Sequence, residues 1–303
     1  MGRFIKNIWK IICYPLMYIG IQVAVTFIYM IVFSIAVGLK IGIESSVTGE
    51  PFQMDNIYEN IYDLIMSQMM IPVVISVFVT VLIIFLILRK EWAAEKFWNF
   101  ARFKISPFLL CISLGAALNV LTICIIAMIP IPPQPSPIDE IVGNNMIIDL
   151  LIISVFTPVL EEIIFRGIVL KRLNKMMRRH TAVFLQALIF GIIHLNLLQG
   201  IYAFFLGVII GYIYLWFDSI YVAIAVHCAY NATSLILFYI FGDSDVNIFY
   251  FLVISALVFI ISIASLVALA ERQEKKAYSH NLTGGNGNNN NDDNNDSDNR
   301  WQL

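Results

Sequence analysis

Two adjacent glutamates and an arginine lie within one apolar stretch of the chain, in the sequence Glu161-Glu162-Ile-Ile-Phe-Arg166. Glu162 and Arg166 are four residues apart with the acid first, the favourable order for an ion pair on one helix face. We therefore interpret them as a structural ion pair. Glu161 lies about 100° away around the helix and has no local partner there. Because an apolar environment disfavours the charged form of a lone carboxylate, Glu161 suits the role of a general base.

A proline lies one turn before these glutamates, at Pro158. Its ring nitrogen carries no hydrogen, so in an α-helix the carbonyl of Ser154 would lose its donor. We therefore expect a kink or a patch of local polarity beside Glu161. The alternative for this stretch is a buried salt bridge that only orients helices.

Two further polar motifs follow in later apolar stretches. They are Phe190-Gly-Ile-Ile-His194 and His227-Cys-Ala-Tyr-Asn231. The spacing in each is i, i+4, so both members of a pair project from one face of a helix. Each pair alone would also suit packing or hydrogen bonding between helices, a common use of polar residues in membranes.

The polar residues of the three motifs are expected at similar depths in the membrane. Glu161 lies ~15 Å and His227 ~13 Å from the expected cytoplasmic ends of their helices, at about 1.5 Å rise per residue. His194 and Asn231 both lie ~20 Å deep by the same measure. Residues that only hold helices together need not agree in depth. The sequence therefore predicts one catalytic site near the middle of the membrane, made of Glu161, His194, His227 and Asn231.

The chain that carries these motifs has the composition of a membrane protein. Hydrophobic residues make up 59% and charged residues 13%, against roughly 45–50% and about 25% in soluble domains. Mean hydropathy is +0.81. The expected fold class is all-α, a polytopic transmembrane helix bundle of about eight spans. The expected spans cover residues 11–37, 71–88, 106–130, 146–170, 181–198, 200–217, 220–240 and 248–270.

Basic residues alternate between the loops that join these spans. Lysine and arginine cluster before the first span, in 89–105, in 171–180 and after the last span, whereas 131–145 contains only acidic charges. Cytoplasmic loops are the basic ones. We therefore expect both termini, including the C-terminal tail, to lie in the cytoplasm.

The sequence also predicts four segments along the chain. A proline-rich run at 130–137 cannot be helical and ends an N-terminal unit. Asp55, Glu59 and Asp63 recur every four residues before the second span, which indicates an amphipathic helix or a solvated helix face. The segments are an N-terminal three-span unit (1–145), a catalytic helix core (146–240), the last span with its basic flank (241–278) and a disordered Asn/Asp-rich tail (279–303).

The three motifs, in this order, resemble the CPBP family of intramembrane metalloproteases, which includes CAAX prenyl proteases and bacteriocin-processing enzymes, also called ABI proteins. The family pattern is EExxxR, FxxxH and HxxxN, and the match covers about residues 146–236. The resemblance implies an endopeptidase in the plasma membrane of a bacterium, acting on a membrane-anchored substrate of the CAAX or leader-peptide type. It further implies that Glu161, with His194, activates water. His227 and Asn231 would stabilise the oxyanion.

Metal dependence stays open at this point. Two histidines and one glutamate can form a zinc site, so a zinc ion would be held by Glu161, His194 and His227. The same groups can also act without a metal, as a glutamate/histidine site.

Other functions compete with proteolysis. In an ion- or proton-coupled transporter the intramembrane charges would form a relay, but the N-terminal half shows no repeat of the motifs. A non-catalytic bacteriocin-immunity-type protein would keep the fold without turnover. The motifs of other protease classes, HExxH and GxSxG, do not occur. The expected partners are a membrane-anchored peptide or protein and the lipid bilayer, with no nucleic acid.

Reporter fusions test the expected topology. Fusions after Lys90, Pro137, Lys175 and Lys276 should report inside, outside, inside and inside, because basic loops are retained in the cytoplasm. Paired reporters, one active in the cytoplasm and one active outside, measure this. An external C-terminus would contradict the eight-span topology.

Overall fold

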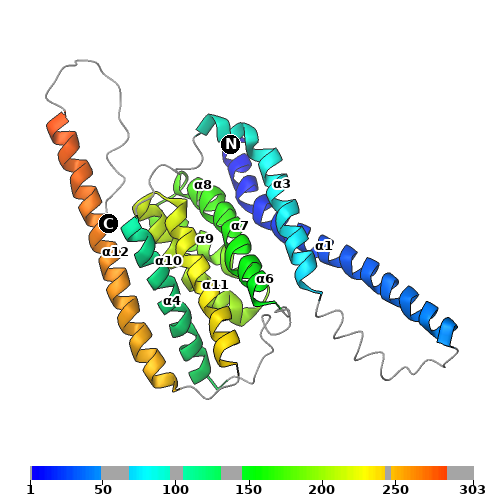
Figure 1. The fold of residues 1–303 in the computed structure, drawn as a ribbon. Coiled ribbons are helices and arrows are strands. Elements are labelled where there is room, and N and C mark those ends of the chain that lie inside the picture. Colours follow the sequence, from blue (N-terminus) through cyan, green and yellow to red (C-terminus); the bar gives the residue numbers. More distant parts are fainter. Residues whose placement is uncertain (1, 49–67, 96–104, 131–144, 243–246, 285–303) are drawn as a thin grey trace. The chain divides into compact units, whose positions relative to one another are not determined.

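The computed structural model describes residues 2–48, 68–95, 105–130, 145–242 and 247–284. All regular structure in these residues is helical (Figure 1), so the expected all-α fold class is confirmed. The chain divides into two compact units, Met1–Leu266 and Val267–Leu303. The first unit contains all three polar motifs, and the second contains the C-terminal part of the last helix.

Six helices in the described residues are long and apolar enough to cross a membrane, which identifies an integral membrane protein. They correspond to six of the expected spans. They are α1 (Gly2–Thr48), α3 (Met70–Glu95), α4 (Ile105–Met128), α10 (Leu197–Phe217), α11 (Ile220–Phe241) and α12 (Ile248–Gly284).

The expected span 146–170 is a continuous helical run in which α and π turns alternate. A π-helix has one extra residue per hydrogen-bonded turn and is found mostly as short bulges at functional sites. The turn that carries both glutamates has a π segment on each side. In order, the segments are α6 (Met146–Leu151), the π-helix η2 (Ile152–Phe156), α7 (Thr157–Glu162), the π-helix η3 (Ile163–Leu170) and α8 (Lys171–Asn174).

Pro158 leaves one backbone carbonyl without an N–H donor beside the first π segment. The backbone hydrogen bond that closes η2 reaches five residues back. In that register the carbonyl of Ile153 faces residue 158, and proline has no N–H to donate. The side chain of Asn231 supplies the donor instead, with Nδ2 at 3.0 Å from the Ile153 oxygen. The expected local polarity is therefore present, but the π register moves it from Ser154 to Ile153.

The expected span 181–198 is helical only over α9 (Arg179–Ile192). A turn follows, because the side chain of Asn196 accepts a backbone N–H and begins α10. Leu195 adopts φ +54°, in the left-handed region, to make this turn. The sequence pattern predicts His194 within a helix. The structure places it instead in the turn after α9.

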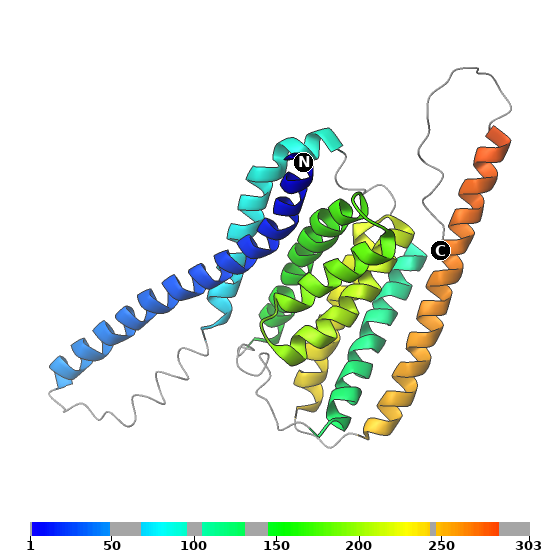
Figure 2. The ribbon, with the colours of Figure 1, turned by 180° about the vertical axis from the view of Figure 1, so that it is seen from behind.

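In each of two helix pairs, the two helices approach each other closely at a glycine. α4 and α11 lie side by side in both views (Figure 1 and Figure 2), as do α9 and α10 by their contacts. A Cβ atom at Gly115 of α4 would come 2.2 Å from the carbonyl oxygen of Val226 in α11. One at Gly191 of α9 would come 2.6 Å from the carbonyl oxygen of Gly200 in α10. Small residues at such contacts let membrane helices pack closely, and here they set the positions of the helices that carry two of the motifs.

The N-terminal helices share a core with the helices of the motifs. Side chains of α1 and α3 pack against residues of α7, η3 and α9 in one buried cluster. Its buried members are Tyr14, Tyr18, Val77, Ile84, Leu160, Ile164, Phe165, Ile168, Phe190 and Ala203.

Three expectations fall wholly or partly outside the described residues. The amphipathic segment with Asp55, Glu59 and Asp63 lies there, as do positions 131–137 of the proline-rich run. The disordered tail was expected from position 279, whereas α12 continues to Gly284. Positions 285–303 lie outside the described residues.

A single added methyl group tests the contact between α4 and α11. Gly115→Ala should lower the free energy of unfolding by about 1–3 kcal/mol, because the methyl would overlap a backbone carbonyl that cannot rotate away. Gly20→Ala is the matched control, since a Cβ at Gly20 meets nothing within 4 Å. Thermal unfolding of the protein purified in detergent measures both. Equal stability of the two variants would contradict the close contact.

Candidate active site

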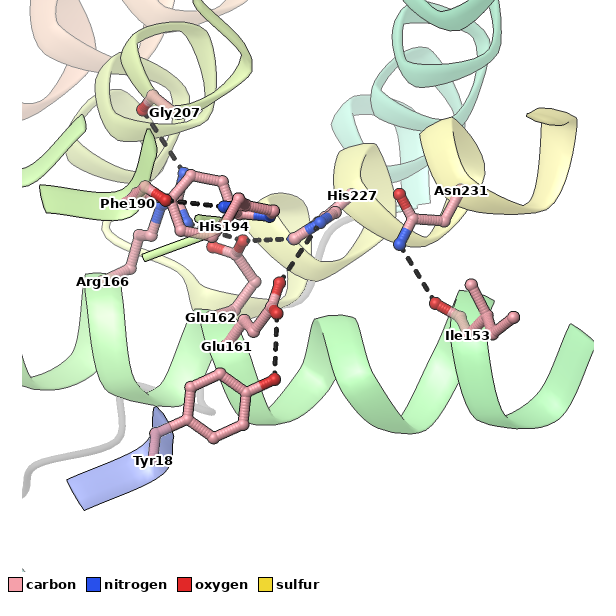
Figure 3. Close-up of polar contacts among 10 residues, drawn as sticks. All are labelled: Tyr18, Ile153, Glu161, Glu162, Arg166, Phe190, His194, Gly207, His227 and Asn231. Atoms are coloured by element: carbon pink, nitrogen blue, oxygen red, sulfur yellow. Dashed lines mark hydrogen bonds and ion pairs between the residues drawn. The ribbon is translucent and has the colours of Figure 1, made fainter. Parts of the chain in front are cut away.

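The two glutamates of α7 are buried and face different partners. Glu162 is 0% exposed and Glu161 is 7% exposed. Figure 3 shows the carboxylate of Glu162 among Arg166 and His227, and that of Glu161 between His227 and Tyr18. Adjacent residues on a helix are rotated by about 100°, so two neighbouring acids can reach side chains from different helices.

One oxygen of Glu162 accepts two hydrogen bonds. Arg166 Nη1 lies 2.8 Å and His227 Nδ1 lies 2.7 Å from Glu162 Oε1. Arg166 Nη2 also donates to the carbonyl of Gly207 in α10, at 3.3 Å. Because a carboxylate beside an arginine is an acceptor only, Nδ1 of His227 must carry a proton. The neutral ring then has its lone pair on Nε2. Glu162 thus belongs to an ion pair and also orients a histidine, a second contact that the sequence did not reveal.

Glu161 is held between α1 and α11. Its Oε1 accepts a hydrogen bond from the hydroxyl of Tyr18, at 3.1 Å, and its Oε2 lies 3.6 Å from His227 Nε2. The second distance is longer than a direct hydrogen bond. Two bare acceptors facing each other would repel, so a proton must be shared in this gap, on the ring, on the acid or on a bound water. Glu161 has no partner on its own helix, as expected, and other helices supply its partners.

His194 is fixed by the end of its own helix. Its Nδ1 lies 2.8 Å from the carbonyl oxygen of Phe190, and because a carbonyl only accepts, Nδ1 carries the proton and Nε2 is left open. The Phe190 ring touches both histidines, with ring centroids 5.0 Å from His194 and 5.7 Å from His227. The Arg166 guanidinium lies 5.0 Å from the same ring. Phe190 is fully buried, and its ring packs against both histidines and against Arg166.

The predicted site residues are brought together to different degrees. Glu161 and His227 face each other directly. His194 joins them through Phe190, and among the described residues no hydrogen bond or ion pair links it to Glu161. Asn231 lies one turn after His227 on α11 and binds the open carbonyl of η2. Its amide has a second N–H, which this bond leaves available.

The described residues do not fit a three-ligand metal site. No group of three or more His, Cys, Asp or Glu side chains among them is arranged to hold a metal ion. Both histidines use Nδ1 elsewhere, and only Glu161 and His227 of the proposed ligand set face each other. The chemistry of this site is therefore derived from its side chains alone.

Tyr18 is the residue at the site that sequence reasoning missed. The prediction of the site rested on charged groups inside the spans, and a tyrosine in the first span carries no charge. A weak signal exists in Tyr14 and Tyr18, two aromatic residues with polar tips at i, i+4 in that apolar span. Such a pair marks one face of a helix but does not say what that face touches.

Part of the chain is similar to a known protease family. Residues 143–233 match the family described as type II CAAX prenyl endopeptidase Rce1-like. The matched stretch contains all three polar motifs and runs from before α6 into α11. Neither the curated proteins nor the solved structures gave a significant match.

The buried ion pair provides a stability test. Glu162→Gln and Arg166→Gln should each lower the free energy of unfolding by ~3–5 kcal/mol, because each leaves one buried charge without its partner. The double variant should recover part of this loss. Glu271→Gln, an exposed acid on α12, is the control and should change nothing measurable. Chemical unfolding in detergent measures all four, and single variants as stable as the wild type would show that the pair is not structural.

Proposed function

We propose that this chain hydrolyses a membrane-associated peptide with a water activated by Glu161. The match of residues 143–233 to the Rce1-like family of type II CAAX prenyl endopeptidases, which are intramembrane proteases, supports this proposal. The observation that carries this proposal is the contact between Glu161 and His227, whose ring is held from behind by Glu162 and Arg166. A buried base and a histidine of fixed tautomer are the groups that peptide hydrolysis needs.

The first chemical step uses Glu161 as the base. A water bound beside Oε2 gives a proton to this carboxylate while its oxygen attacks the carbonyl carbon of the scissile bond. His194 assists, because its Nε2 is left open by the bond from Nδ1 to Phe190. When the tetrahedral intermediate collapses, the bond from carbon to nitrogen breaks and the proton on Glu161 passes to the leaving amine. Water is thereby divided between the two products.

His227 and Asn231 stabilise the negative oxygen of the intermediate. Glu162 holds Nδ1 of His227, so Nε2 faces the reacting groups. It presents an N–H to the oxyanion when the proton shared with Glu161 lies on the ring. Asn231 has one N–H left after binding the Ile153 carbonyl. Donors that are fixed before the reaction stabilise developing charge strongly in a buried site, because no reorganisation is needed.

The proposed substrate is a membrane-anchored peptide, with a prenylated CAAX-type tail or a leader peptide. Glu161 and His227 are buried in a helix bundle whose outer side chains are large and apolar. A substrate with its own lipid or apolar anchor is already concentrated in the bilayer next to such a site. The family description supports the CAAX-type tail, and both classes can be compared directly.

Substitutions at the site test this mechanism. Glu161→Gln should lower the cleavage rate by ~10²–10⁴-fold, because glutamine cannot accept the proton from water. His194→Ala should do likewise, and the double variant should lose little more, since both groups act on one water. Asn231→Ala should cost ~10²–10³-fold. Mass spectrometry of farnesylated CAAX peptides and leader peptides incubated with proteoliposomes measures the rates.

Two controls separate this mechanism from other roles of the same residues. His180→Ala changes an exposed histidine that pairs with Tyr212 outside the site and should leave cleavage unchanged. Proton flux is recorded in the same proteoliposomes. Full activity of Glu161→Gln, or proton flux by a wild type that cleaves neither peptide class, would overturn the proposed function.

A further inference from the structure

The N-terminal helix contributes a buried hydroxyl group to the candidate base. Tyr18 of α1 is 3% exposed, and its hydroxyl donates to Glu161 Oε1 at 3.1 Å (Figure 3). Residue 18 lies far outside the stretch 143–233 that matches the protease family. A donor to the reacting carboxylate therefore comes from a part of the chain to which the family match assigns no role.

Two contacts one turn apart hold this face of α1 against the site. Tyr14 is 4% exposed, and the guanidinium of Arg172 lies 5.7 Å from its ring. Tyr18 packs in the buried cluster with Ile164 and Phe165 of η3. Because Tyr14 and Tyr18 are four residues apart, they lie on the same face of the helix. Rotation of α1 about its axis would break both contacts together, so the Tyr18 hydroxyl is held in place.

We propose that Tyr18 is a positioning residue for Glu161, and that α1 is thereby part of the catalytic unit rather than only a membrane anchor. This inference rests on the proposed function, in which Glu161 is the base. The oxygen bound by Tyr18 is Oε1, whereas Oε2 is the oxygen that faces His227. The hydroxyl thus fixes which oxygen is presented to the water.

The hydrogen bond restrains the orientation of the base. Rotation about the last torsion of a glutamate is soft and would exchange its two oxygens, and a donor on Oε1 opposes this exchange. His227 from α11 faces the other oxygen, Oε2. The contacts on the two oxygens together hold the carboxylate in one orientation.

The test is Tyr18→Phe in the full-length protein, which keeps the ring and its packing but removes the donor. The kcat for peptide cleavage should fall about 10- to 100-fold, the range for losing one hydrogen bond to a charged group. KM should stay unchanged, because the hydroxyl touches no substrate. A change in kcat without a change in KM separates an effect on the base from a loss of substrate binding.

Tyr14→Phe is the matched control. It removes a hydroxyl from the same buried face of α1, one turn away, and keeps the ring beside Arg172. It should leave kcat at the wild-type value. A second variant replaces Tyr18 with a fluorinated tyrosine, which keeps both the shape and the donor. Its kcat should stay close to the wild-type value, unlike that of Tyr18→Phe.

The outcomes separate this inference from the proposed function. A wild-type kcat in Tyr18→Phe, with Glu161→Gln inactive, would overturn the role of Tyr18 and leave the proposed function intact. A loss of kcat in Tyr18→Phe that Tyr14→Phe reproduces would show a merely structural contact and also overturn the role of Tyr18. Full cleavage by Glu161→Gln would instead remove the proposed function itself.

Discussion

One oxygen atom, Oε1 of Glu162, connects the parts of this site. It accepts from Arg166 and from His227 at distances below 3 Å, in a position with no exposed surface. A buried carboxylate is strongly unfavourable unless it is paired and fully hydrogen-bonded, so neither donor can leave without cost. The bond to His227 joins α11 to α7 and sets the tautomer of the ring. The same bond fixes the orientation of the ring, so that Nε2 faces Glu161, and the proposed chemistry depends on this orientation.

The π turns on either side of α7 leave one backbone carbonyl open near the two glutamates. α7 is a short α segment between η2 and η3, and each π turn changes the rotation of the helix relative to a continuous α-helix. The open carbonyl at Ile153 is the local cost of this irregularity. Asn231 offsets that cost with a hydrogen bond from α11. His227 and Asn231 therefore both hold α11 against the irregular helix, one at the glutamates and one at the π turn.

The sequence predicted the fold class and the three motifs because both follow from composition and from spacing within a single helix. It did not predict the contact between Glu162 and His227, since the rotation of α11 depends on packing such as that of Gly115 against Val226. The α register assigned the open carbonyl to Ser154, because nothing in the sequence announced a π turn. Tyr18 was not predicted as part of the site, because the prediction rested on charged groups and a hydroxyl has no charge.

The family motifs account for the acid and both histidines but not for everything that holds them. The stretch 143–233 contains Glu161 and His227, yet the donor to Glu161 Oε1 comes from α1. Side chains of α1 and α3 also complete the buried cluster around Phe165 and Phe190. Without those helices, Phe190 would lose packing on one side. Its ring contacts the rings of both histidines. The geometry of the candidate site is therefore a property of the N-terminal helices and of residues 143–233 together, because each part buries apolar surface of the other.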